Sequence, residues 1–109
     1  MRRVNEAVRE VLSDAMKRLK DPRVGFVTVT DVRTSPDLRH AKVFVSVLGG
    51  AEERAASLEG LRSAHGFLQG RVAGELRLKR TPTLDFVYDD TAERADRLER
   101  MLAELEHKP

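Results

Sequence analysis

Apolar residues recur at steps of three and four along residues 3–19, which is the spacing of one face of an α-helix. The outer positions of this segment are charged, so the pattern predicts an amphipathic helix that packs on a core. Asp21 and Pro22 follow, and because the residue before a proline disfavours the helical region, we expect the helix to end before them. The apolar positions are Val4, Ala7, Val8, Val11, Leu12, Ala15, Met16 and Leu19.

Two strand patterns come next, joined by a short turn. Residues 25–34 are rich in valine and threonine, and residues 39–48 alternate between apolar and polar side chains, so both segments predict strands. Ser35, Pro36 and Asp37 between them have turn chemistry, and so short a connection predicts antiparallel pairing. One face of the second strand carries Ala41, Val43, Val45 and Val47. The other face carries His40, Lys42, Phe44 and Ser46.

The middle of the chain predicts two consecutive helices. Helical spacing runs from Ala51 to Ala64 and again from Phe67 to Leu76, with a break at Ser63-Ala64-His65-Gly66. Glycine is unusual inside a helix because it costs about 1 kcal/mol relative to alanine. The four glycines at positions 60, 66, 70 and 74 therefore indicate either a bend or close approach of another backbone.

A short strand and a last helix complete the pattern. Residues 84–88 predict the strand, and Asp89, Asp90 and Thr91 are candidate caps for a helix over residues 91–106. We expect the apolar face of this helix to point inward. That face consists of Ala95, Leu98, Leu102 and Leu105.

The resulting order is α-β-β-α-α-β followed by a C-terminal helix. It predicts an α+β fold in which helices cover one face of a three-stranded sheet. The 109 residues suffice for one core, and neither a repeat nor a linker divides them, so we expect a single domain over residues 1–109. The aromatic residues are mostly core candidates, Phe44 least clearly, which leaves few platforms for stacking bases. They are Phe26, Phe44, Phe67, Phe86 and Tyr88.

Composition narrows the functional classes. There is no cysteine, hence no disulfide and no thiolate metal site, and no apolar stretch approaches the roughly 20 residues that span a bilayer. Cytoplasm is the expected compartment. The net charge of +2 is unevenly distributed. Residues 1–80 carry 16 basic and 10 acidic side chains, whereas residues 81–109 carry 4 basic and 8 acidic side chains. A basic body with an acidic end suggests a polyanionic partner, although random drift of surface charge gives the same sums.

Catalytic signatures are missing from the sequence. It has no G-x-S-x-G elbow, phosphate-binding loop or dinucleotide fingerprint, and His40, His65 and His107 are scattered. Asp85, Asp89 and Asp90 could hold Mg²⁺ in a small RNA-processing nuclease, but helix capping explains the last two more simply. We therefore expect no enzyme activity, metal or cofactor.

Basic residues fall into three groups, which could bind RNA phosphates. Cations near the end of a helix also favour its dipole, so two of the groups have a plain structural explanation as well. The first group is Arg39, His40 and Lys42, at the start of the second strand. The second is Arg71, Arg77, Lys79 and Arg80, at the end of the third helix. The third is Lys17, Arg18, Lys20 and Arg23, after the first helix.

Three segments resemble the ribosome-binding factor A family of bacterial small-subunit assembly factors. They are RVNEAVREVLS at 3–13, DPRVGFVTVTDVRTSPDLRHAKVFVSVLG at 21–49 and RLKRTPTLDFVYDD at 77–90. The resemblance implies a type II KH-like fold, in which the usual G-x-x-G loop is replaced by an interhelical kink. Here the kink would be Ala64, His65 and Gly66.

The resemblance also implies a function. Family members bind the free 30S small ribosomal subunit and its 16S rRNA late in maturation, assist 5′-end processing and have no catalytic activity. We accordingly expect a monomer that uses neither a membrane nor a small-molecule substrate. Some members carry a longer basic tail, whereas the last helix here is acidic. An interaction module that binds ribosomal proteins through the sheet or the last helix is the alternative.

Overall fold

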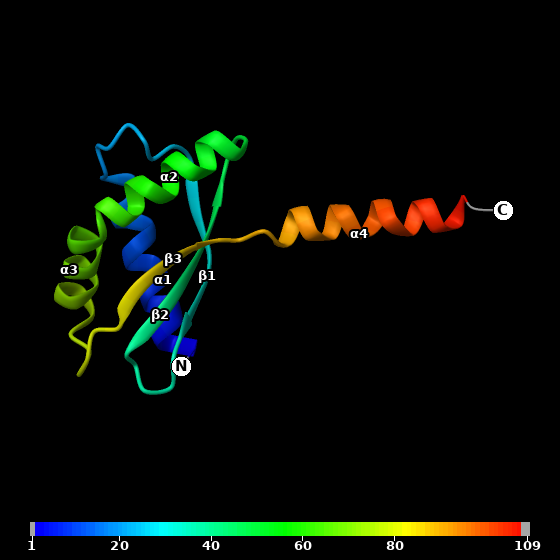
Figure 1. Cartoon of the computed structure of the whole chain (residues 1–109). Helices are drawn as coiled ribbons and strands as arrows, with labels where there is room; N and C mark the ends of the chain where they lie inside the picture. The colour runs from blue at the N-terminus through cyan, green and yellow to red at the C-terminus, as the bar shows by residue number, and fades with distance from the viewer. Residues whose placement is uncertain (1, 108–109) are drawn as a thin grey trace.

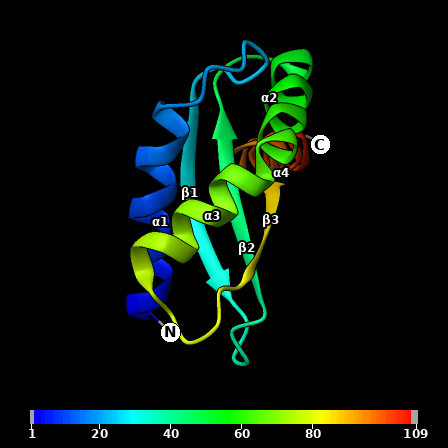
Figure 2. The same ribbon diagram turned by 90° about the vertical axis from the view of Figure 1, so that its left-hand side faces the viewer.

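The structure, a computed structural model, describes residues 2–107. The elements are α1 (Arg2–Lys17), β1 (Val27–Thr34), β2 (His40–Val47), α2 (Ala51–Ser63), α3 (His65–Leu76), β3 (Thr83–Tyr88) and α4 (Thr91–Glu106). This is the predicted order. β2 is the central strand, antiparallel to β1 and parallel to β3. Helices α1, α2 and α3 lie on one face of the sheet, which confirms the predicted α+β layers (Figures 1 and 2). We call residues 2–88 the body.

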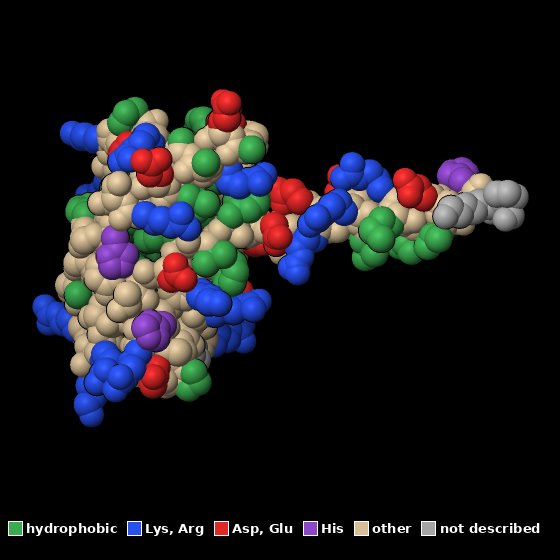
Figure 3. All heavy atoms as spheres, viewed as in Figure 1, with side chains coloured by type: hydrophobic (Ala, Val, Ile, Leu, Met, Phe, Trp, Pro, Cys, Tyr) green, Lys and Arg blue, Asp and Glu red, His purple; other side chains and the backbone are tan. Residues whose placement is uncertain are grey.

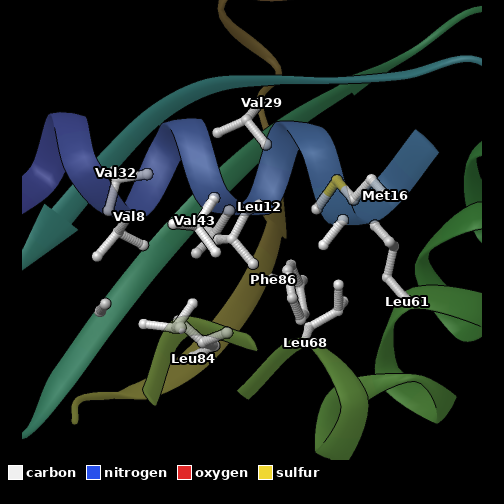
Figure 4. Close-up of a cluster of buried hydrophobic side chains, with 14 of the residues drawn as sticks. Val8, Leu12, Met16, Val29, Val32, Val43, Leu61, Leu68, Leu84 and Phe86 are labelled. Carbon is white, nitrogen blue, oxygen red and sulfur yellow. The ribbon is translucent and has the colours of Figure 1, made fainter. Parts of the chain in front are cut away.

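The core fills the space between the sheet and these three helices (Figure 4). Helix α1 supplies the predicted apolar face, with Val8 and Leu12 fully buried, and β2 supplies Val43 and Val45. The alternation predicted for β2 is therefore confirmed. Each fully buried side chain of this size stabilises the fold by roughly 1.5–3 kcal/mol. The other elements contribute Val29, Val32, Leu61, Leu68, Val72, Leu84 and Phe86.

Helix α3 also holds the outer edge of β3. The side chain of Gln69 donates to the carbonyl of Pro82 over 2.6 Å and accepts from the backbone N–H of Leu84 over 3.0 Å. The Nε2 atom of His65 lies 3.1 Å from the carbonyl oxygen of Leu84. These side chains satisfy backbone groups that an edge strand would otherwise leave unpaired.

A β-bulge interrupts β1. Val29 pairs with Val45 and Asp31 with Phe44, so Thr30 is the extra residue. A bulge shifts the alternation by one residue. Val29 and Val32, three positions apart, therefore both point into the core, and Arg33 is exposed.

The inward orientation predicted for the last helix is wrong. Helix α4 leaves the end of β3 and projects away from the body (Figure 1). None of its residues is buried. A helical period shows that one face is apolar but says nothing of what covers it, and the body already closes its core without α4. The exposed residues include all four predicted to face inward, Ala95, Leu98, Leu102 and Leu105.

The aromatic residues also depart from the prediction. Phe86 is buried as expected, but Phe26 is 81% exposed and Phe67 48% exposed. Phe26 lies just before β1, in the loop that follows α1. Phe44 and Tyr88 are half-buried.

Candidate nucleic-acid interface

One of the three predicted basic groups and most of a second lie at one end of the sheet. β2 begins at His40, which pairs with Thr83 at the start of β3. The backbone N–H of Thr83 donates to the carbonyl of Arg39 over 2.8 Å, which places the loop after α3 beside the start of β2. Figure 3 shows Lys and Arg side chains at this lower end of the body. We call these residues the sheet-end basic surface: Arg39, His40, Lys42, Arg77, Lys79 and Arg80.

Most of these cations form no salt bridge within residues 2–107, although Asp85 of β3 lies across the ladder from Lys42. Arg39 lies 3.7 Å from Asp37, whose own pKa is lowered by hydrogen bonds from the Ser35 hydroxyl and the Arg39 N–H. In the described part of the chain, no carboxylate lies within salt-bridge distance of the four other Lys and Arg side chains of this surface, which are Lys42, Arg77, Lys79 and Arg80. All four are exposed. Such side chains can neutralise phosphates without first breaking an ion pair.

Arg77 has an unusual backbone. It ends α3 with φ 46° and ψ 40°, the left-handed conformation that glycine usually supplies after a helix. A side chain in this conformation costs roughly 1–2 kcal/mol. Helix termination alone would therefore favour glycine over arginine at this position.

Sequence reasoning missed further cations at the same end. Arg33 pairs across the ladder with Lys42 and lies over the Phe44 ring at 5.3 Å, although it also contacts Asp31 at 3.0 Å. Strict alternation would turn Arg33 inward, and the valine spacing at 29 and 32 was the available signal of a bulge. The start of α1, with Arg2 and Arg3, adjoins this end because Asn5 accepts from the backbone N–H of Thr34 over 3.0 Å.

The third predicted group lies elsewhere, at the far end of α1. Two of its members are engaged in ion pairs. Arg23 contacts Asp21 at 2.6 Å and Glu59 at 3.2 Å, and its hydrogen bonds lower the pKa of Asp21 to about 2. Arg18 lies 3.5 Å from Asp14. Lys17 and Lys20 are exposed and form no salt bridge within the described chain.

Arg71 lies apart from the loop residues of its predicted group. Its guanidinium donates to Glu75 over 2.9 Å and contacts Asp14 of α1 at 3.4 Å. Its side chain is 26% exposed. In this arrangement Arg71 links α3 to α1.

The break between the helices lies at Ala64, where α2 ends and α3 begins. Ala64 leaves helical geometry with φ −87° and ψ 9°. A Cβ added at Gly66 would meet no atom within 4 Å, so packing does not demand glycine there. His65 instead holds the break against β3, through the contact with Leu84 described above.

Of the acidic residues considered for catalysis, Asp89 has a structural role. Asp89 accepts from the Thr30 hydroxyl over 2.6 Å and from the N–H of Thr91 over 3.0 Å, and these bonds lower its pKa to about 2. Asp90 is the N-cap residue of α4 but makes no capping bond with its side chain. No cluster of three or more potential metal ligands occurs within residues 2–107.

Comparison with known proteins identifies the family. A sequence model of the family "Ribosome-binding factor A" matches residues 1–102. Ribosome-binding factor A of an Anaeromyxobacter species is 50% identical over 108 residues, covering 97% of this chain and 88% of that protein. The chain belongs to the ribosome-binding factor A family. The Geobacter metallireducens member is 43% identical over 104 residues, 94% of this chain and 88% of the relative.

Solved structures agree with the observed fold. The crystal structure of ribosome-binding factor A from Thermus thermophilus superposes with a TM-score of 0.70 at 28% identity, over 79% of this chain and 92% of that one. A homology model of the same protein has been fitted into the cryo-EM map of a complex with the 30S subunit. It superposes with a TM-score of 0.65 at 29% identity, over 76% of this chain and 88% of that one. The fold is thus the KH-like fold of this family. No helix within residues 2–107 is long and apolar enough to cross a membrane.

Proposed function

We propose that this protein is a non-catalytic assembly factor that binds the free 30S small ribosomal subunit through its 16S rRNA. It assists late subunit maturation, including processing of the 5′ end of 16S rRNA. It acts in the cytoplasm as a single domain over residues 1–109, without a cofactor, a small-molecule substrate or a membrane. Family membership supports the ribosomal partner.

The observation that carries the proposal is the sheet-end basic surface. Two chain segments about 40 residues apart bring cations together there, and Lys42, Arg77, Lys79 and Arg80 form no salt bridge within the described residues. Their role is to contact phosphates and sugars of the rRNA. The sheet offers little for stacking bases, because Phe44 is half-buried under Arg33. Recognition of RNA shape and backbone fits this surface better than reading of single strands.

The other predicted residues take lesser parts in this proposal. Lys17 and Lys20 are available for a second RNA contact at the far end of α1. Arg18, Arg23 and Arg71 bind carboxylates of the protein itself, so they would have to exchange these partners to reach a phosphate.

Sedimentation with free 30S subunits tests the proposal. The variant Lys79→Glu/Arg80→Glu reverses two exposed loop cations and leaves the strained Arg77 backbone untouched. We expect its affinity to fall by at least about tenfold, because reversal removes two phosphate contacts and adds repulsion. The matched control Arg9→Glu/Arg100→Glu makes the same change in net charge at exposed positions outside the surface.

Equal losses in both variants would show a general charge effect and contradict the assigned surface. Binding that persists at high salt would favour the alternative of contacts with ribosomal proteins. Cleavage of precursor 16S rRNA by the purified protein with Mg²⁺ would contradict the non-catalytic assignment.

A further inference from the structure

Helix α4 carries an apolar stripe that neither the core nor the basic surface uses. Its members recur at steps of three, one and three, so they share one face of the helix. Their side chains are between 51% and 64% exposed. Figure 3 shows hydrophobic side chains along one side of the projecting helix. The α4 stripe consists of Leu98, Met101, Leu102 and Leu105.

Contacts at the start of α4 hold the helix in its projecting position. The Tyr88 hydroxyl donates a hydrogen bond to the carboxylate of Glu93 in the first turn. The guanidinium of Arg54 lies 4.0 Å from the centre of the Tyr88 ring. Arg54 also contacts Glu93 at 3.9 Å. These contacts join α4 to α2 and β3, so the body presents the α4 stripe outward.

Acidic side chains border one side of the α4 stripe. Glu99 precedes Leu102 by three residues and Glu106 follows it by four, so both lie beside it. Neither forms a salt bridge within residues 2–107, whereas Arg94 and Arg100 pair with acids of their own helix region. Arg97 precedes Met101 by four residues, so it lies on the other side of the stripe, and it forms no salt bridge within these residues either. With five acidic and three basic residues, α4 has a net charge of −2. A phosphate-lined surface would repel this border.

We propose that the α4 stripe docks in an apolar groove, edged by Lys and Arg, on a basic protein of the small ribosomal subunit. This inference rests on the proposed function, because binding of the body to rRNA brings α4 close to proteins that are themselves bound to RNA. Such proteins carry basic surfaces. An amphipathic helix in a groove is a common mode of recognition, anchored by residues at these spacings. The acidic side chains beside the α4 stripe and the Lys and Arg side chains at the edge of the groove have opposite charges. Their attraction would fix the position of α4 along the groove and favour this partner over others.

A second copy of the chain is a weaker candidate for the partner. The exposed α4 stripe presents on the order of 400 Å² per copy, so two paired α4 helices would bury about 800 Å², below the roughly 1,200 Å² of stable complexes. In an antiparallel pair, the Glu99 and Glu106 borders would also face each other. Like charges in contact oppose such pairing.

The variant Leu98→Gln/Leu102→Gln tests the docking in the full chain. Glutamine keeps helix propensity close to that of leucine, and the positions are exposed, so the body should fold unchanged. The control Ala92→Gln/Ala103→Gln places the same side chains on the opposite face of α4. We expect the stripe variant to bind free 30S subunits at least about tenfold more weakly, and to bind protein-free 16S rRNA as the wild type does. The control should match the wild type on both.

In a second experiment, Leu105 is replaced by the photo-crosslinking residue benzoylphenylalanine. Its result does not depend on the folding of the Leu98→Gln/Leu102→Gln variant. Irradiation on purified 30S subunits should join it to a ribosomal protein, and the same group at Ala103, on the opposite face, should give much less product. A crosslink to rRNA or to another copy of the chain would overturn the proposal. So would unchanged subunit binding by the stripe variant, or an equal loss on protein-free rRNA.

Failure of the proposed function is a separate result. It would be seen if the wild-type chain did not sediment with free subunits at all. A stripe-dependent complex with proteins extracted from the subunit would then still support the docking, and absence of that complex would overturn it.

Discussion

Arg77 combines two properties that a single residue rarely has. Its backbone lies in the left-handed region after α3, where glycine is favoured, and its side chain lies in the sheet-end basic surface without an acidic partner in the described chain. Under the proposed function, stability and RNA binding therefore make opposite demands at this position.

Replacement of Arg77 by glycine should separate these demands. We expect Arg77→Gly to raise the free energy of unfolding by about 0.5–1 kcal/mol, because glycine adopts this backbone without strain. The same change should weaken binding to 16S rRNA several-fold by removing a phosphate contact. Urea denaturation and RNA titration measure the two effects. Arg77→Ala is the control that loses the contact but keeps the strain, and a gain in stability there would refute the backbone explanation.

The glycines show how far residue-level prediction reached. Their number correctly indicated close approach at one position, since a Cβ at Gly60 would lie 2.6 Å from a methyl carbon of Val24. It gave no way to tell Gly60 from Gly70 and Gly74, which face open space. That difference depends on the loop after α1 crossing α2, a tertiary contact without a local sequence signal.

At the scale of elements, the junction between β3 and α4 depends on Asp89. Its carboxylate joins β1, through Thr30, to the start of α4, through Thr91, and its backbone N–H donates to Val45 over 2.8 Å. These bonds favour the ionised form and lower the pKa of Asp89 from 3.8 to about 2. A lowered pKa in the folded state stabilises the fold above the unfolded pKa, and this contribution disappears as the pH falls toward the folded value.

Substitution of Asp89 should therefore have a pH-dependent effect. At pH 7 we expect Asp89→Asn to have a thermal midpoint a few degrees below that of the wild type, because the amide lacks the charge that strengthens these bonds. The difference should be constant down to about pH 4 and shrink between there and pH 2. Circular dichroism melts across this range measure it. Asp21, whose pKa is also about 2, is present in both proteins and cancels in the comparison. A constant difference at all pH values would rule out the charge of Asp89 as the cause.

The elements themselves were largely predictable, and the errors have physical causes. The strict alternation of Ala41, Val43 and Val45 predicted both that β2 is a strand and which of its faces is buried. It could do so because β2 is the central strand and is covered on one side. Arg33 was missed because a bulge shifts the phase of an edge strand. The predicted orientation of α4 was wrong because a helix has the same amphipathic pattern whether its apolar face packs on the body or on another molecule.

At the scale of the whole molecule, charge and apolar surface lie at separate places. Lys and Arg side chains that form no salt bridge within the described chain gather at one end of the sheet, and the acidic α4 with its apolar stripe projects from the body (Figures 1 and 3). The sequence predicted the difference in charge between the two parts. It could not predict that Arg39 would lie beside Thr83 and the loop before it, because that depends on parallel pairing of β2 with β3 across about 40 residues.

This separation predicts how salt acts on binding. Phosphate contacts release counterions, so the logarithm of the affinity for 16S rRNA should fall linearly with the logarithm of the salt concentration. Neutralising two contacts in Lys79→Gln/Arg80→Gln should reduce that slope by about 1.5–2. Leu98→Gln/Leu102→Gln should leave the slope unchanged, because the α4 stripe releases no counterions from RNA. Titrations at four or more salt concentrations measure both slopes. A slope unchanged in the first variant would mean that Lys79 and Arg80 do not contact phosphates, whatever their effect on affinity at a single salt concentration.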